Sequence, residues 1–245
     1  MKNIILSKGF PEAVLLDTDN TLYPYIPAHR EATLAVEDKV EKQLGIDKET
    51  FRAAFSESRQ DIKVRLGNVA SSHSRLLYLQ KTIEKLELGT RILTTLDLEQ
   101  TYWRTFLVNC RLFPGVLDFI QLLKSRGIAT ANITDLTAQI QFRKLVYFGL
   151  DELFDYVVTS EEAGADKPDI RPFEVALEKL QIKPEKIWMI GDNPKNDMAG
   201  AAKLGMIKIQ KNHHGVVISD LIEEKPDLIV SHYSELISLI SNSRS

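Results

Sequence analysis

The chain has 245 residues, of which 44% are apolar and 27% charged, and its formal net charge is −3. This length can bury a sizeable core, and the weak charge gives no electrostatic case for binding a nucleic acid polymer or a membrane surface. The apolar runs are too short to span a bilayer, and a single cysteine, Cys110, excludes an intrachain disulfide. The N-terminus MKNIILSKGFPE lacks the apolar stretch and cleavage site of a signal peptide, so we expect a soluble, cytoplasmic protein.

Short apolar runs recur along the chain and predict strands of a parallel sheet. The first run, Ala13 to Leu16, is apolar at every position, which suits a central strand with helices on both faces. Five further runs have the same character and are expected to form strands at residues 128–133, 156–159, 187–190, 206–209 and 228–230.

Helical patterns alternate with the later runs, and this alternation predicts an α/β fold with a Rossmann-like parallel sheet. One helix is expected to end near Gly127 and another to begin at Pro172, because these residue types are favoured at those ends. The helix between the second and third strands has its expected apolar face at Ile140, Phe142, Leu145 and Val146.

The segment between the first two strands differs, because it has helical spacing and no convincing strand pattern. Gly45, Gly67 and Gly89 stand where three of its helices would end. Asp97 with Gln100 predicts a capping box at the start of a fourth helix. About 80 residues suffice for a small bundle. We therefore expect an inserted all-helical domain at residues 22–107 and an α/β core at residues 1–21 and 108–245.

Two carboxylates follow the first strand directly, in the tract AVLLDTDNTLYPY. Asp17 and Asp19 stand at the carboxyl end of the strand, where parallel α/β sheets bind their ligands. Close carboxylates repel each other unless one is protonated or a cation lies between them, and Mg²⁺ prefers oxygen ligands. A turn built from Asp, Asn and Thr is the alternative interpretation, and this tract alone does not decide between the two.

Three later strands also end in polar residues. Thr134 follows the second strand, Lys167 lies in GADKPD after the third, and GDNPKND after the fourth contains Asp192 and Asp197. Each residue has a structural alternative: a helix cap for Thr134, a surface charge for Lys167, and turn or cap residues for the two aspartates. All of these residues fall at one edge of the predicted sheet, each after a successive strand along the chain. We therefore interpret them as one site.

The four tracts DTDNT, NITD, ADKPD and GDNPKND resemble the motifs of the haloacid dehalogenase-like hydrolase superfamily. The resemblance covers essentially the entire chain and identifies the helical insertion as a cap domain. It implies a Mg²⁺-dependent phosphomonoesterase that hydrolyses a small phosphorylated metabolite, a nucleotide or a sugar phosphate, through an aspartyl phosphate. The tract DNTLYP is similar to that of the pyrimidine 5′-nucleotidase-like branch.

The resemblance also implies roles for the motif residues. Asp17 would be the nucleophile, and Asp19 would act as general acid and then as general base. Thr134 and Lys167 would bind the transferring phosphoryl group. Mg²⁺ would be held by Asp17, by the backbone carbonyl of Asp19 and by Asp192, while Asp197 would orient Lys167 or a metal-bound water.

Asp135 departs from the pattern of the superfamily, whose members often have Asn after the second-motif hydroxyl residue. A further acidic group facing an anionic substrate is unfavourable. Asp135 therefore either caps the helix from Thr137, which we favour, or contacts a substrate hydroxyl.

Three functions remain open at this stage. Asp19 favours phosphate chemistry over dehalogenation, because haloacid dehalogenases lack a carboxylate two residues after the nucleophile. The alternatives to a phosphatase are a phosphotransferase or phosphomutase with the same chemistry, and a non-catalytic binding or regulatory protein. The substrate and the oligomeric state are left open.

Six residues of the helical insertion are candidates for contacting the substrate, although a solvated helix face is the better explanation for most of them. They are Arg59, Lys63, Arg65, His73, Arg75 and Tyr78.

Overall fold

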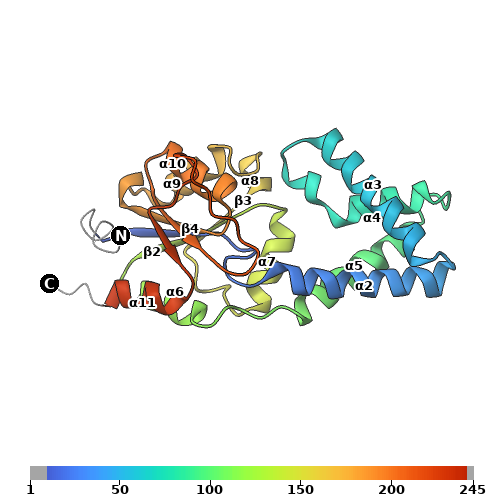
Figure 1. Ribbon diagram of the computed structural model, residues 1–245, viewed down its shortest axis with the longest axis horizontal. Helices are drawn as coiled ribbons and strands as arrows, with labels where there is room; N and C mark the ends of the chain where they lie inside the picture. Colours follow the sequence, from blue (N-terminus) through green and yellow to red (C-terminus); the bar gives the residue numbers. More distant parts are fainter. Residues whose placement is uncertain (1–9, 242–245) are drawn as a thin grey trace. The chain divides into compact units, whose positions relative to one another are not determined.

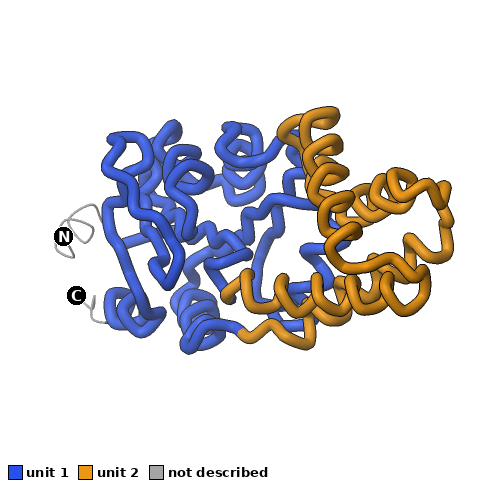
Figure 2. The backbone as a smooth tube through the Cα atoms, turned by 45° about the vertical axis from the view of Figure 1, so that its right-hand side comes forward, with its two compact units in different colours: residues 1–23, 112–245 blue, residues 24–111 orange. Residues whose placement is uncertain are grey.

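The computed structural model describes residues 10–241 (Figure 1). Residues 1–9, which make up most of the segment examined for a signal peptide, lie outside the described part. The chain forms two compact units (Figure 2): one runs to Tyr23 and resumes at Leu112, and the other is Pro24–Arg111. Among residues 10–241, no helix combines the length and apolar character that crossing a bilayer requires.

The first unit contains a six-stranded sheet in the order β3-β2-β1-β4-β5-β6, and every neighbouring pair is parallel. Each strand falls within two residues of a predicted apolar run, so the predicted α/β fold class is confirmed. The strands are β1 (Ala13–Leu16), β2 (Ala129–Thr134), β3 (Tyr156–Thr159), β4 (Ile187–Gly191), β5 (Ile207–Lys211) and β6 (Leu228–Val230).

Helices cover both faces of this sheet. Figure 1 shows α9 (Arg171–Leu180) and α10 (Ala199–Lys203) on one side, and α6 (Val116–Ser125) and α11 (Tyr233–Ser241) on the other. On the first side, Phe173 of α9 packs in one cluster with Ala13 and Leu15 of β1. On the second, the rings of Phe119 and Tyr233 join α6 to α11 at 5.7 Å. Burial on both faces explains why β1 is apolar at every position.

Shorter elements complete the first unit. The helix α7 (Ala138–Tyr147) follows β2, and the single turn α8 (Ser160–Ala163) follows β3. A 3₁₀ turn, Pro184–Lys186, precedes β4, and a π-helical turn, Pro194–Met198, follows it.

The second unit is built from helices α2 (Tyr25–Leu44), α3 (Lys48–Leu66), α4 (Arg75–Lys85) and α5 (Ile92–Val108), with a 3₁₀ turn at Ala70–His73. Gly45 and Gly67 end α2 and α3, as predicted, and both have positive φ angles, 70° and 71°. Gly89 does not end α4 directly, because that helix stops at Lys85 and is capped by Leu86. The observed unit, Pro24–Arg111, begins two residues later and ends four residues later than the expected range 22–107.

The predicted capping box in this unit is wrong. The helix α5 begins at Ile92, so Asp97 and Gln100 lie inside it. Asp97 instead pairs with Lys39 of α2 at 2.6 Å. The first turn of α5 carries two exposed apolar side chains, Ile92 and Leu93, and no capping side chain, which hides the start of the helix from a sequence pattern.

Candidate active site

The carboxyl edge of the central strands gathers the predicted site residues. Leu16, the last residue of β1, pairs with Asn132 of β2 and with Ile190 of β4. The residues that come next along each strand therefore reach the same edge. Together with the loop after α8, this edge lines a cavity of about 180 Å³ whose walls include Asp17, Asp19, Thr134, Asp135, Lys167, Asp192 and Asp197.

Lys167 joins two of these carboxylates. Its Nζ donates to Asp17 Oδ1 and to Asp197 Oδ1, each at 2.7 Å, and to the carbonyl of Ile133 at 3.1 Å. Burial alone would lower the pKa of Lys167, but Asp17 and Asp197 outweigh it and hold this pKa well above its usual value. Lys167 is therefore a fixed positive charge within the cavity.

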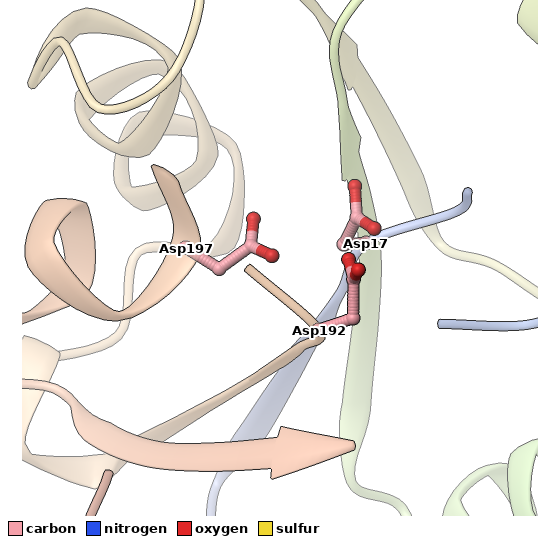
Figure 3. A group of neighbouring side chains, drawn as sticks. All are labelled: Asp17, Asp192 and Asp197. Carbon is pink, nitrogen blue, oxygen red and sulfur yellow. The ribbon is translucent and has the colours of Figure 1, made fainter. Parts of the chain in front are cut away.

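The acidic residues carry more negative charge than Lys167 neutralises. One carboxylate oxygen each from Asp17, Asp192 and Asp197 lies within 4.8 Å of the others (Figure 3). Burial raises the pKa of Asp17 to about 7 and that of Asp192 to about 8, and the neighbouring carboxylates add to both shifts. Oxygen ligands with excess negative charge fit a hard divalent cation such as Mg²⁺.

Asp197 has a different environment from the other two aspartates. Its Oδ2 accepts the backbone N–H of Asn193 at 3.1 Å, while its Oδ1 accepts from Lys167. A Cβ atom at Gly191 would lie 2.2 Å from Asp197 Oδ2, so only glycine lets the end of β4 pass this carboxylate. With both oxygens engaged by protein donors, Asp197 is placed to orient Lys167.

Asp19 is held by two side chains that the sequence analysis did not identify. Lys144 of α7 donates from Nζ to Asp19 Oδ1 at 2.8 Å and to Oδ2 at 3.0 Å, and the Tyr23 hydroxyl also donates to Oδ1. The Lys144 side chain is fully buried, whereas the Asp19 side chain is 30% exposed. Asp19 thus presents a fixed carboxylate to the cavity.

The expected apolar face of α7 is correct at Leu145 but wrong at Phe142 and Val146, and this error concealed Lys144. Phe142 and Val146 are 51% and 62% exposed, while Gln141, Lys144 and Leu145 are buried. The signal available in the sequence was the spacing of Gln141, Lys144 and Leu145, which places them on one side of the helix. A long polar side chain on a buried side is found mainly when it has a partner, so this spacing could have indicated a partner for Lys144.

The expectation that Asp135 caps α7 is also wrong. Asp135 Oδ1 accepts from the Ser160 hydroxyl and from the Lys167 backbone N–H, both at 2.9 Å. The first free N–H of α7, from Ala138, is accepted by Glu161 instead, at 2.9 Å. Because β2 and β3 are neighbours, the loops that follow them meet, and Asp135 links these loops. Burial raises the pKa of its carboxyl group.

We expect Mg²⁺ to stabilise the folded protein more at about pH 8 than at about pH 5.5. The folded pKa values of Asp17 and Asp192, about 7 and about 8, exceed the ordinary value of 3.8. The folded state therefore keeps protons that the unfolded state releases, and without metal its stability falls as the pH rises from about 4 to about 8. A bound cation replaces those protons, so its contribution grows over the same window.

Melting temperatures with and without excess Mg²⁺ test this expectation. A rise of about 5 °C is expected near pH 8, and less than half of that near pH 5.5. The Asp192→Asn variant is the control and should lose most of the rise. An equal rise at both pH values would contradict the linkage.

A parallel sheet whose carboxyl edge gathers carboxylates around one buried lysine, with a helical unit inserted after the first strand, is typical of hydrolases that have a Rossmann-like core and an inserted helical domain. The chain belongs to the haloacid dehalogenase-like hydrolase family, whose model matches residues 11–205.

Relatives agree with this assignment. The chain is 35% identical over 196 residues to the ribulose-1,5-bisphosphate 5-phosphatase of Halopiger xanaduensis, covering 79% of this chain and 82% of that protein. It is 29% identical over 240 residues to the glyceraldehyde 3-phosphate phosphatase of Methanocaldococcus jannaschii, covering 94% and 97%. The crystal structure of an HAD phosphatase from Thermococcus onnurineus shares the fold, with a TM-score of 0.72 at 24% identity over 95% of this chain and 99% of that one.

Neither of the two named relatives is a nucleotidase. The similarity of DNTLYP to the nucleotidase-like branch therefore stays a prediction.

Proposed function

We propose that the protein is a Mg²⁺-dependent phosphatase that hydrolyses a small phosphorylated metabolite, with sugar phosphates as the favoured class. The observation that carries the proposal is the buried contact between Lys167 and Asp17 at a cavity that also contains Asp19. The phosphatase names of the relatives support the substrate class. A cytoplasmic location stays part of the proposal.

Asp17 is the nucleophile in this proposal. The Thr21 hydroxyl donates to Asp17 Oδ2 at 2.9 Å and Lys167 donates to Oδ1, so the carboxylate is oriented from both sides. It attacks phosphorus, the ester oxygen leaves, and an aspartyl phosphate forms. Lys167 and the Thr134 hydroxyl offset the charge of the transferring phosphoryl oxygens. When bound, Mg²⁺ would be held by Asp17, Asp192 and the Asp19 backbone carbonyl, and would neutralise phosphoryl charge.

Asp19 is the general acid and base. It protonates the leaving alkoxide in the first step and accepts a proton from the attacking water in the second, which restores Asp17 and releases inorganic phosphate. Lys144 and Tyr23 fix the orientation of this carboxylate. A phosphomutase would follow the same first step, with a second sugar hydroxyl in place of water.

A panel of phosphorylated metabolites tests the function. Purified protein is incubated with each compound and Mg²⁺, and both inorganic phosphate and the loss of ester are measured. We expect one phosphate for each ester consumed, no release after chelation with EDTA, and recovery when Mg²⁺ is returned. Ester rearrangement without phosphate release would favour the mutase, and full activity after exhaustive chelation would contradict the metal assignment.

Variants of Asp19 and Asp192 separate their two proposed roles. Asp19→Asn should slow an alkyl phosphate by about 100-fold or more and an aryl phosphate less, because only the alkoxide needs a proton to leave. The backbone carbonyl survives this change, so Mg²⁺ affinity should fall little. Asp192→Asn should weaken Mg²⁺ binding about tenfold or more and slow both substrates alike.

Single-turnover rates and Mg²⁺ titrations of both variants provide the measurement. Wild-type protein at saturating Mg²⁺ is the reference for each substrate. If Asp19→Asn loses the same factor on both esters and binds Mg²⁺ as poorly as Asp192→Asn, then Asp19 is chiefly a metal-site residue.

A further inference from the structure

The helical unit contains a half-buried arginine surrounded by tyrosines. Arg75 is the first residue of α4, and its guanidinium carbon lies 5.4 Å from the ring centre of Tyr78 and 5.1 Å from that of Tyr102. Its Nη2 donates to the Tyr25 hydroxyl at 2.6 Å. The Tyr25 and Tyr102 hydroxyls are 3.3 Å apart, so residues of α2, α4 and α5 meet around one guanidinium.

Arg75 differs from Arg52 and Lys39 of the same unit, which pair with carboxylates. Arg52 donates to both oxygens of Glu37 at 2.6 Å, and Lys39 pairs with Asp97 at 2.6 Å. In the described part of the chain, no carboxylate pairs with Arg75, and its Nε is buried without an acceptor. A buried guanidinium without a negatively charged partner has lost hydration that nothing replaces, so binding an anion there is favourable.

A second arginine adds to this positive charge. Burial first, and then Arg75 and Arg59, lower the pKa of His29 to about 4, so this imidazole is neutral at pH 7. His29 Nδ1 lies 2.8 Å from the Tyr102 hydroxyl. The groups gathered around Arg75 are therefore phenol hydroxyls and a neutral imidazole, and Arg59 lies near enough to act on His29 and Tyr78.

We propose that the Arg75 cluster, formed by Arg75, Arg59, Tyr25, Tyr102 and His29, binds an oxyanion, either a phosphate or a carboxylate group. The planar guanidinium offers paired N–H donors that match two oxygens of such a group, and phenol hydroxyls add neutral donors. The tyrosine rings limit water around the cation, which strengthens the attraction to an anion.

The anion has two possible sources that share this chemistry. It is either a second charged group of the substrate or a free anion. In the first case the inference rests on the proposed function and narrows the substrate class to phosphate monoesters that carry a second phosphate or a carboxylate.

Binding is tested directly with sulfate as the probe. The full chain is titrated with sulfate, and the Nε–Hε resonance of Arg75, assigned by its loss in Arg75→Met, is followed by NMR. We expect a saturable shift, weakened about threefold or more in Tyr25→Phe, which removes one hydroxyl and keeps the ring. Arg104→Met, which removes an exposed arginine from α5, is the matched control and should leave the shift unchanged. No saturable shift up to about 50 mM sulfate, with no selective kinetic effect, overturns the proposal.

Matched substrates identify the source of the anion. One pair is 3-phosphoglycerate and glycerol 1-phosphate, and a second is ribulose 1,5-bisphosphate and ribulose 5-phosphate. If the substrate supplies the anion, Arg75→Met lowers kcat/KM at least about tenfold on the more anionic member, mainly through KM, and less than about threefold on the other. If the anion is free, both members fall alike, and sulfate accelerates the wild type but not Arg75→Met. Hydrolysis of none of these esters would count against the proposed function, while the sulfate titration still decides the anion site.

Discussion

Replacing Asp17 by asparagine is expected to reduce turnover by more than about 10³-fold while leaving the fold intact. An amide is not a competent nucleophile toward phosphorus, and catalytic groups that act as a unit lose nearly all of their effect when one is removed. The single amide oxygen can still accept from Lys167, and the amide NH2 then faces the Thr21 hydroxyl, which can accept instead of donate. Lys167 also keeps its ion pair with Asp197. The loss should therefore be catalytic rather than structural.

Three measurements separate these outcomes for Asp17→Asn. Circular dichroism and the melting temperature report the fold, phosphate release reports turnover, and acid-quenched protein incubated with a radiolabelled substrate reports the aspartyl phosphate. We expect label on the wild type and none on the variant. Near wild-type turnover in Asp17→Asn would exclude the covalent mechanism.

Replacing Lys167 by methionine should affect both activity and stability. Removing one partner of a buried ion pair leaves uncompensated charge, at a cost of about 3–5 kcal/mol, and here two carboxylates lose their shared cation. Turnover should fall at least about 10²-fold, because a positive charge aimed at the phosphoryl oxygens is lost. Mg²⁺ should recover part of the stability, since it would bind Asp17, one of the two carboxylates that lose their cation.

The free energy of unfolding from urea titration, with and without Mg²⁺, provides the stability measurement for Lys167→Met. Turnover is measured well below the melting temperature, so that unfolding does not contribute. Lys186→Met is the matched control, because Lys186 forms an exposed pair with Glu12 at 3.8 Å and should contribute less than about 1 kcal/mol. Equal effects of the two substitutions would contradict the role of Lys167.

The sheet could be predicted from the sequence because each strand is a short apolar run, and this local pattern can be recognised without knowing which strands lie beside it. The positions of Asp17, Thr134 and Asp192 at one edge follow from the same pattern, because parallel strands end together. Their chemical roles stay predictions that the experiments above test. The inserted unit was recognisable as helical, but the start of α5 was not, because that helix begins with exposed apolar residues and has no capping side chain.

Contacts between distant residues were the part that sequence patterns could not supply. Lys144 lies 125 residues from Asp19 in the chain, and a lysine on a helix is ordinarily solvated. Its burial depends on where another strand places its carboxylate, which periodicity does not report. The same holds for Asp135, whose partners are Ser160 at the start of α8 and the Lys167 backbone in the loop after that turn.

The pairing of Lys144 with Asp19 has a consequence for how the sequence can change over evolutionary time. The buried ammonium of Lys144 donates to both oxygens of a carboxylate at the cavity. A mutation that neutralised Asp19 would remove the proposed acid and would also deprive a buried cation of its counter-charge, which costs stability. A substitution that removes the charge of Asp19 is therefore expected to lower the stability of the fold as well as the activity, unless Lys144 has first changed to a smaller apolar residue. Natural relatives in which residue 19 is no longer acidic are then expected to have also replaced the lysine, and the order of these two changes is constrained.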